Sequence, residues 1–228
     1  MKPIRKLQAP NRVSNQAILY FILYPSSLIL RGMNTRILLA GILGGVVMFI
    51  WSFVAHDVLP LGELGVGEIP NEDAVTSSMQ ASMGDKVGFY IFPGPGLTPD
   101  ATREQKAEGM KKIEAKMAAG PAGVLIYHPK RVFNFPKRLV IEFVTEVILT
   151  LLAVFLLVQT NIRGFFGKVG FVLTVGILAA IATNVPYWNW YGFPRMYTFG
   201  LMLTEILAFL LAGIVVAIVL GKRTTAAN

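Results

Sequence analysis

The stretch "RLVIEFVTEVILTLLAVFLLVQT" at 138–160 decides the fold class. Its apolar run is long enough for a helix, rising about 1.5 Å per residue, to cross a hydrocarbon core about 30 Å thick. Three further runs have span length, so the predicted transmembrane helices are 33–59, 138–159, 168–186 and 197–221. The predicted fold is therefore mainly α. It is a four-helix transmembrane bundle with a small α/β extracytoplasmic cap, residues 60–137, inserted between the first and second spans.

The composition supports this class. Apolar residues make up 54% of the chain and charged residues only 15%, whereas about 25% of the residues in soluble domains are charged. The imbalance indicates an integral membrane protein. The chain contains no cysteine, which excludes disulfides, thiolate catalysis, iron–sulfur clusters and covalently attached c-type haem.

The net charge of +8 does not indicate binding to nucleic acid. Five cations and no acid lie in residues 1–32, and most of the others flank the apolar runs. The lipid bilayer and its headgroups account for cations in those places. For residues 1–32, a basic and apolar extension, three interpretations stay open: a start assigned too far upstream of Met33, an uncleaved interfacial helix, or a fifth span.

Cations beside the spans predict the orientation. Five of them would share one side of the membrane: Arg36, Arg163, Lys168, Lys222 and Arg223. The positive-inside rule makes that side cytoplasmic. We therefore expect a bacterial inner-membrane protein with both termini, including the tail 222–228, in the cytoplasm and residues 60–137 outside. The cations at the start of the second span oppose this, but long translocated loops follow the rule weakly.

The predicted cap has a strand–helix–strand pattern. Asn71 is expected to cap a short first helix. A strand at 87–92 is followed by a helix for which Thr98 is the expected N-cap and Gly120 the end, and a second strand lies at 123–127. Because such units favour a right-handed crossover, we expect the two strands to be parallel.

Polar side chains recur at one depth in the four spans. With the predicted topology they all fall in the outer half of the membrane: His56, Asp57, Arg138, Glu142, Glu146, Asn184 and Glu205. Arg138 can pair with Glu142 one turn away. Glu146 and Glu205 lie too deep to reach the interface, so they are expected to be protonated, paired or exposed to a wet cavity. The sequence therefore predicts a shared polar pocket beneath the cap.

The role of this pocket stays open between three interpretations. Its groups can be structural hydrogen bonds between helices, a site for a proton, cation or polar ligand, or a contact with a charged span of another protein. His56, Glu146 and Glu205 are weak candidates for metal ligands, since no Glu-x-x-His motif accompanies them. A haem b would need His56 and His128, and His128 lies far along the cap. No cofactor is therefore assigned.

Small residues four apart predict close helix contacts, at Gly41/Gly45, Gly176/Ala180 and Ala208/Ala212. These contacts belong either within one bundle or at the seam of a homodimer. Because the chain has no recognisable catalytic motif, the favoured hypothesis is a non-catalytic accessory, assembly or partner-binding membrane protein. The alternatives are a small oligomeric transporter or channel that uses Glu146 and Glu205, and a metal-dependent membrane enzyme.

Overall fold

The structure, a computed structural model, describes residues 34–221, so the predictions for 1–32 and for the tail 222–228 lie outside the described residues. Four helices in this range are long and apolar enough to cross a membrane. They are α3 (Thr35–Phe53, continued by a π-helical segment Val54–Val58), α6 (Phe135–Val158), α7 (Phe165–Tyr191) and α8 (Arg195–Leu220). Each predicted span is therefore a single helical segment. Helix α7 passes through Pro186 and ends five residues later than expected.

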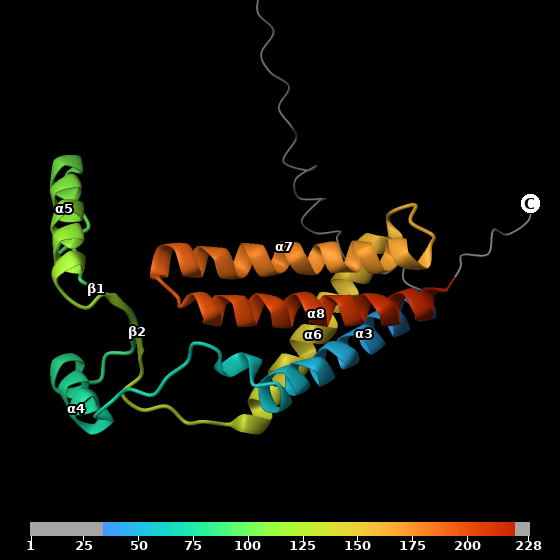
Figure 1. The fold of residues 1–228 in the computed structure, drawn as a ribbon, viewed down its shortest axis with the longest axis horizontal. Coiled ribbons are helices and arrows are strands. Elements are labelled where there is room, and N and C mark those ends of the chain that lie inside the picture. The colour runs from blue at the N-terminus through green and yellow to red at the C-terminus, as the bar shows by residue number, and fades with distance from the viewer. Residues whose placement is uncertain (1–33, 222–228) are drawn as a thin grey trace, which may run out of the picture.

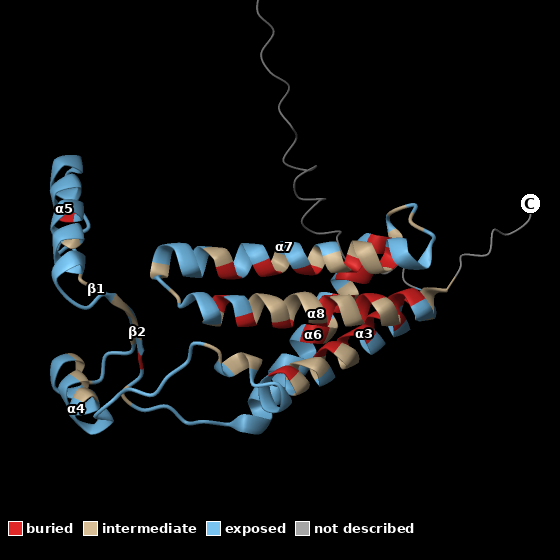
Figure 2. Ribbon diagram, in the orientation of Figure 1, coloured by how far each residue is buried: buried red, intermediate tan, exposed pale blue. Residues whose placement is uncertain are grey.

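The four long helices form two pairs. Helices α7 and α8 lie side by side as an antiparallel hairpin, and α3 packs on both α6 and α8 (Figure 1). Helix α6 has little contact with α7 or α8. Figure 2 shows the buried residues along the faces where these helices meet. The core is a cluster of apolar side chains: Ile37, Ala40, Met48, Ala153, Val154, Leu157, Val172, Ala208, Phe209, Ala212 and Val216.

The helices approach one another most closely at glycines, and these contacts join helices of the same chain. A Cβ added to Gly45 of α3 would lie 2.5 Å from Cα of Val147 on α6. A Cβ on Gly176 of α7 would overlap Phe209 of α8. Both small-residue positions therefore serve packing inside one bundle, the first of the two interpretations drawn from the sequence.

At one end of the bundle, two cationic side chains cap the C-terminus of α8. Arg36 Nε donates to the carbonyl of Val219 at 2.6 Å, and Lys168 Nζ donates to the carbonyl of Gly221. Both carbonyls lie at the C-terminus of α8, where the helix dipole is negative. The starts of α3 and α7 and the end of α8 therefore share one end, here called the tail end. The opposite end, which bears residues 60–137, is called the cap end.

The cap contains two short helices and two strands: α4 (Glu72–Met83), β1 (Gly88–Phe92), α5 (Arg103–Ala119) and β2 (Gly123–Tyr127). Helix α4 starts directly after Asn71 as expected, although the Asn71 side chain makes no capping hydrogen bond. Helix α5 starts later than predicted, because Thr102 and not Thr98 is its N-cap. Thr102 and Gln105 form a reciprocal capping box.

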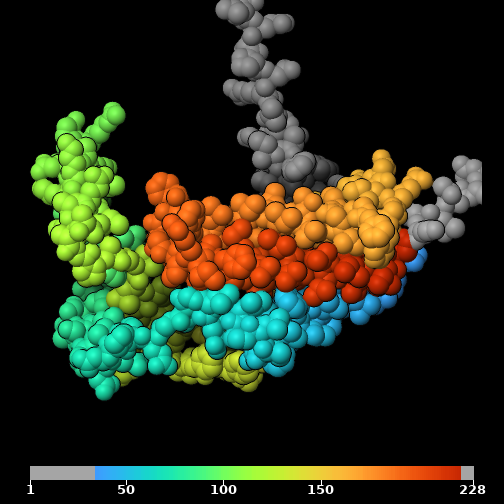
Figure 3. Space-filling model, viewed as in Figure 1, coloured from blue at the N-terminus to red at the C-terminus, as the bar shows by residue number. Residues whose placement is uncertain are grey.

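The prediction of parallel strands was wrong. Strand β1 pairs antiparallel with β2, with Phe89 opposite Ile126 and Phe92 opposite Gly123. A crossover needs the intervening helix to pack on the sheet, whereas α5 makes no extensive contact with either strand. The helix projects from the rest of the molecule (Figure 3). Residues 93–102 instead lead away from the sheet beside α5. A Cβ added to Gly109 of α5 would lie only 2.9 Å from Leu97 of this segment. The helix then returns the chain to the end of the sheet that it left, which makes the strands antiparallel.

Two contacts fix the cap near the ends of the spans. Phe89 of β1 meets the ring of Tyr191 edge-on, at 5.5 Å between centroids. After α3, a short 3₁₀ segment (Leu61–Glu63) crosses the first turns of α8. A Cβ on Gly200 would lie only 2.7 Å from the carbonyl oxygen of Leu61, so a glycine is needed for this approach.

Candidate functional site

A cavity of about 210 Å³ lies between α3, α6 and α8, in the half of the bundle nearer the cap end. Four of the seven side chains predicted for the pocket line it: His56, Glu142, Glu146 and Glu205. The rest of its lining is mixed: Met48, Ser52, Thr145, Leu149, Thr204, Ala208 and Phe209. The structure thus brings together acidic groups that lie up to 63 residues apart in the sequence, as Glu142 and Glu205 do. We call this space the acidic cavity.

Glu146 is the most buried acid of the cavity, with 7% of its surface exposed. Its Oε1 accepts a hydrogen bond from Ser52 of α3 at 3.2 Å. Its Oε2 is buried without a hydrogen-bond partner among the described residues. One turn further along α6, Thr150 donates to the backbone carbonyl of Glu146 at 2.7 Å and fixes that part of the helix.

Glu205 is held from the other side. Asn184 of α7 donates to Glu205 Oε2 at 3.3 Å, and also to the carbonyl of Ala180 at 3.0 Å. The neighbouring carbonyl, that of Thr204, accepts a hydrogen bond from the indole of Trp51 at 2.9 Å. Asn184, which was predicted for the pocket, is therefore linked to the cavity by its hydrogen bond to Glu205. Trp51 connects α3 to α8 at the same level of the bundle.

A second cavity, of about 680 Å³, adjoins the first along the groove between α3 and α6. Ser52, His56 and Glu142 line both cavities. Asp57 and Arg138 line the second cavity but not the first, beside apolar residues: Phe49, Ile50, Phe53, Phe135 and Leu139. Asp57 and Arg138 thus lie next to the acidic cavity but not in it.

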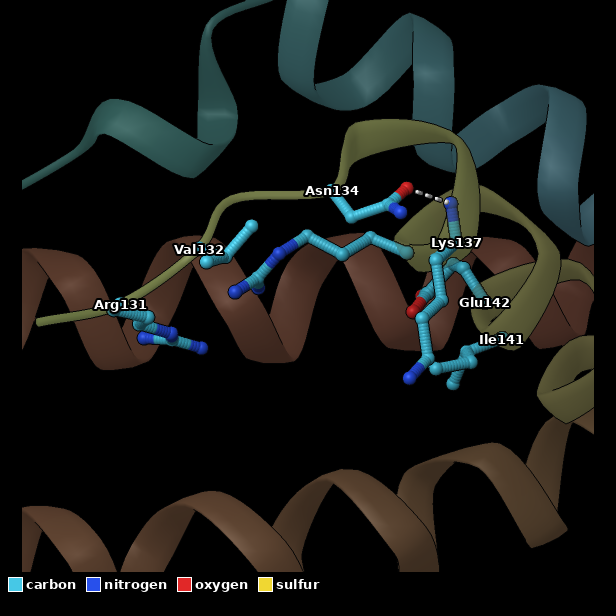
Figure 4. A pocket seen from close by; sticks show the side chains of 7 residues that line it. Arg131, Val132, Asn134, Lys137, Ile141 and Glu142 are labelled. Atoms are coloured by element: carbon cyan, nitrogen blue, oxygen red, sulfur yellow. Dashed lines mark hydrogen bonds between the residues drawn. The ribbon is translucent and has the colours of Figure 1, made fainter.

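A third hollow, of about 400 Å³, lies where the chain enters α6 (Figure 4). It is rich in cations, with Arg131, Lys137 and Arg138 among its lining residues, and Asn134 caps α6 there by accepting from the backbone N–H of Lys137 at 2.9 Å. The predicted pair between Arg138 and Glu142 is not formed in the described part of the chain. The guanidinium lies instead over the ring of Phe133, 4.9 Å from its centre.

The predicted metal ligands are not arranged as a metal site. Within residues 34–221, no group of three His, Asp or Glu side chains is placed to hold an ion. His56 Nδ1 lies 2.9 Å from the carbonyl of Ser52, one turn back on its own helix. His128 follows β2 in the cap and lines none of the three cavities described above.

Sequence reasoning missed Thr204, Phe209 and the indole of Trp51 as parts of this region. Ser52 could be placed near His56 from the sequence, because residues four apart lie on the same helix face. No family model, curated protein or solved structure matches the chain. The functional argument therefore rests on the residues of this chain.

Proposed function

We propose that this protein is a non-catalytic, multi-pass membrane protein whose cap binds a partner protein, as an accessory or assembly subunit. The observation that carries the proposal is one face of the two-stranded sheet. Its apolar residues Phe89, Ile91 and Ile126 are 49%, 59% and 64% exposed. We call this set the open sheet face.

The two faces of the sheet differ. On the side opposite the open sheet face, Tyr127 is buried and its hydroxyl donates to Gln80 of α4 at 2.8 Å. On the open sheet face, the ring of Phe89 meets the ring of Tyr191 edge-on, and much of the apolar surface stays exposed in the part of the chain that the structure describes. Two strands are too few for a stable sheet in water, so a face of this kind favours a further covering element.

Helix α5 supports the same proposal. It has 17 residues and projects from the cap without extensive contact to any other described element. Met110 and Met117 on this helix are 56% and 54% exposed. Helices in proteins owe most of their stability to packing of an apolar face against other elements, and methionines are common on surfaces that accept other proteins.

The proposed location is a bacterial inner membrane with the tail end in the cytoplasm. Arg36, Arg163 and Lys168 lie at or beside the tail end, as the positive-inside rule requires of a cytoplasmic side. The cap and its open sheet face are then exposed outside the membrane, where a partner can reach them.

The test is recovery of a partner from native membranes. Solubilised in mild detergent, the full chain should co-purify with one protein at a fixed ratio. The double variant Ile91→Ser/Ile126→Ser should lose that protein, whereas Ser78→Ala on the exposed surface of α4 should retain it. Repeated isolation of the bare chain after crosslinking at the open sheet face would contradict the proposal.

A transporter is the second candidate, because Glu146 and Glu205 face one cavity. In the half of the bundle toward the tail end, the cluster around Val154, Leu157 and Val216 is buried. Transport of an ion through the bundle would therefore need another conformation or a second copy of the chain. In liposomes, Glu146→Gln and Glu205→Gln would each abolish flux if this candidate were right.

A further inference from the structure

The acidic cavity carries an inference that is independent of the proposed role of the cap. Glu142 and Glu146 of α6 and Glu205 of α8 line it, together with His56 of α3. Among the described residues, no Lys or Arg lines it. The cations nearest along the chain, such as Arg138, line the neighbouring cavities instead. The cavity therefore has an excess of hydrogen-bond acceptors and of acidic groups.

The second observation is the unfilled acceptor on Glu146. This side chain is more than nine-tenths buried and lines the cavity, yet its Oε2 has no donor among the described residues. Buried carboxyl oxygens without a partner are rare, because leaving one unpaired costs free energy. A donor from outside the chain would satisfy it.

The shape and lining of the cavity restrict what that donor can be. A bare metal ion is a poor match, because no three acidic or histidine ligands converge within residues 34–221 and about 210 Å³ would be left mostly empty. That volume corresponds to about seven water molecules at roughly 30 Å³ each. Met48, Leu149, Ala208 and Phe209 supply an apolar wall that suits carbon atoms better than water.

We propose that this cavity binds a small alkylammonium cation. Its ammonium group donates to Glu146 Oε2 and is stabilised by the charge of Glu205. Its carbon atoms contact Met48, Leu149 and Phe209. The adjoining cavity between α3 and α6 gives access from the cap end, and His56 and Glu142 stand at the junction of the two cavities.

The test uses the purified full chain in detergent micelles and n-butylammonium chloride as the probe. Binding is followed by calorimetry and by the fluorescence of the tryptophans, among which Trp51 lies beside the cavity. We expect saturable binding of butylammonium and none of 1-butanol, its neutral counterpart of equal size. Glu146→Gln and Glu205→Gln should each weaken binding by about 10- to 100-fold. Glu114→Gln on α5 is the matched control and should bind as the wild type does.

A measurement on the unaltered chain covers the case in which a variant fails to fold. Dicyclohexylcarbodiimide modifies carboxyl groups in apolar surroundings, and peptide mass spectrometry locates the adduct. Butylammonium should protect Glu146 from this reagent, and 1-butanol should not. The proposal is overturned by an absence of saturable binding and protection, by equal binding of 1-butanol, or by calcium chloride binding where butylammonium does not.

Discussion

Asn184 of α7 donates a hydrogen bond to Glu205 of α8 across 3.3 Å, and this pair joins the two helices beside the acidic cavity. Asn184 is 7% exposed, so water has little access to its amide. Hydrogen bonds between membrane helices contribute about 0.6–2 kcal/mol. This contact therefore both orients Glu205 and holds the hairpin of α7 and α8 together near the cap end.

Replacing Asn184 should destabilise the bundle. Asn184→Ala removes the donor to Glu205, so we expect the free energy of unfolding to fall by about 0.6–2 kcal/mol. Reversible unfolding in mixed micelles measures this change. Asn189→Ala, at an exposed position of the same helix, should be close to neutral. Equal effects of the two variants would show that the Asn184 contact is not stabilising.

Gly45 gives a second prediction, which concerns packing. An added methyl group would lie 2.5 Å from Cα of Val147, a backbone atom that cannot move away without shifting α6. We expect Gly45→Ala to lower the free energy of unfolding by about 1–3 kcal/mol, the usual cost of overpacking. Gly170→Ala on α7 faces open space and serves as the control. A Gly45→Ala protein as stable as the control would contradict the close contact between α3 and α6.

The tail end offers a third prediction. Lys168 is 4% exposed and donates to the carbonyl of Gly221, after the last turn of α8. Lys168→Met keeps most of the side-chain volume but removes the charge from the negative end of the helix. We expect a loss of about 1 kcal/mol in the free energy of unfolding. Arg163→Gln, exposed in the loop between α6 and α7, should change stability little, and a loss as large as that of Lys168→Met would count against specific capping.

The four long apolar helices could be predicted from the sequence, because runs of about 20 predominantly apolar residues have few other stable arrangements. The acidic cavity was predictable in part, since the depth of Glu146 and Glu205 in their spans follows from residue numbers alone. The pairing of Ser52 with Glu146, and of Asn184 with Glu205, depends on which helices are neighbours. Hydropathy does not determine that arrangement.

The cap was harder to predict for two physical reasons. The rule that favours parallel strands assumes that the connecting helix packs on the sheet, and α5 does not. Two threonines could cap α5, at 98 and 102. The pattern Thr102-x-x-Gln105 was the informative signal, because it allows the reciprocal capping box that the structure contains.

The orientation of the bundle gives the last prediction, and the absence of cysteine from the chain makes it simple to test. Single variants Ser77→Cys on α4 and Asn161→Cys between α6 and α7 place a thiol at exposed positions of the cap and of the tail end. In intact spheroplasts a membrane-impermeant maleimide should label Ser77→Cys and leave Asn161→Cys unlabelled until the membrane is opened by detergent. The cysteine-free parent chain controls for background labelling. The reverse pattern would place the cap in the cytoplasm, and a partner recruited by the open sheet face would then be a cytoplasmic protein.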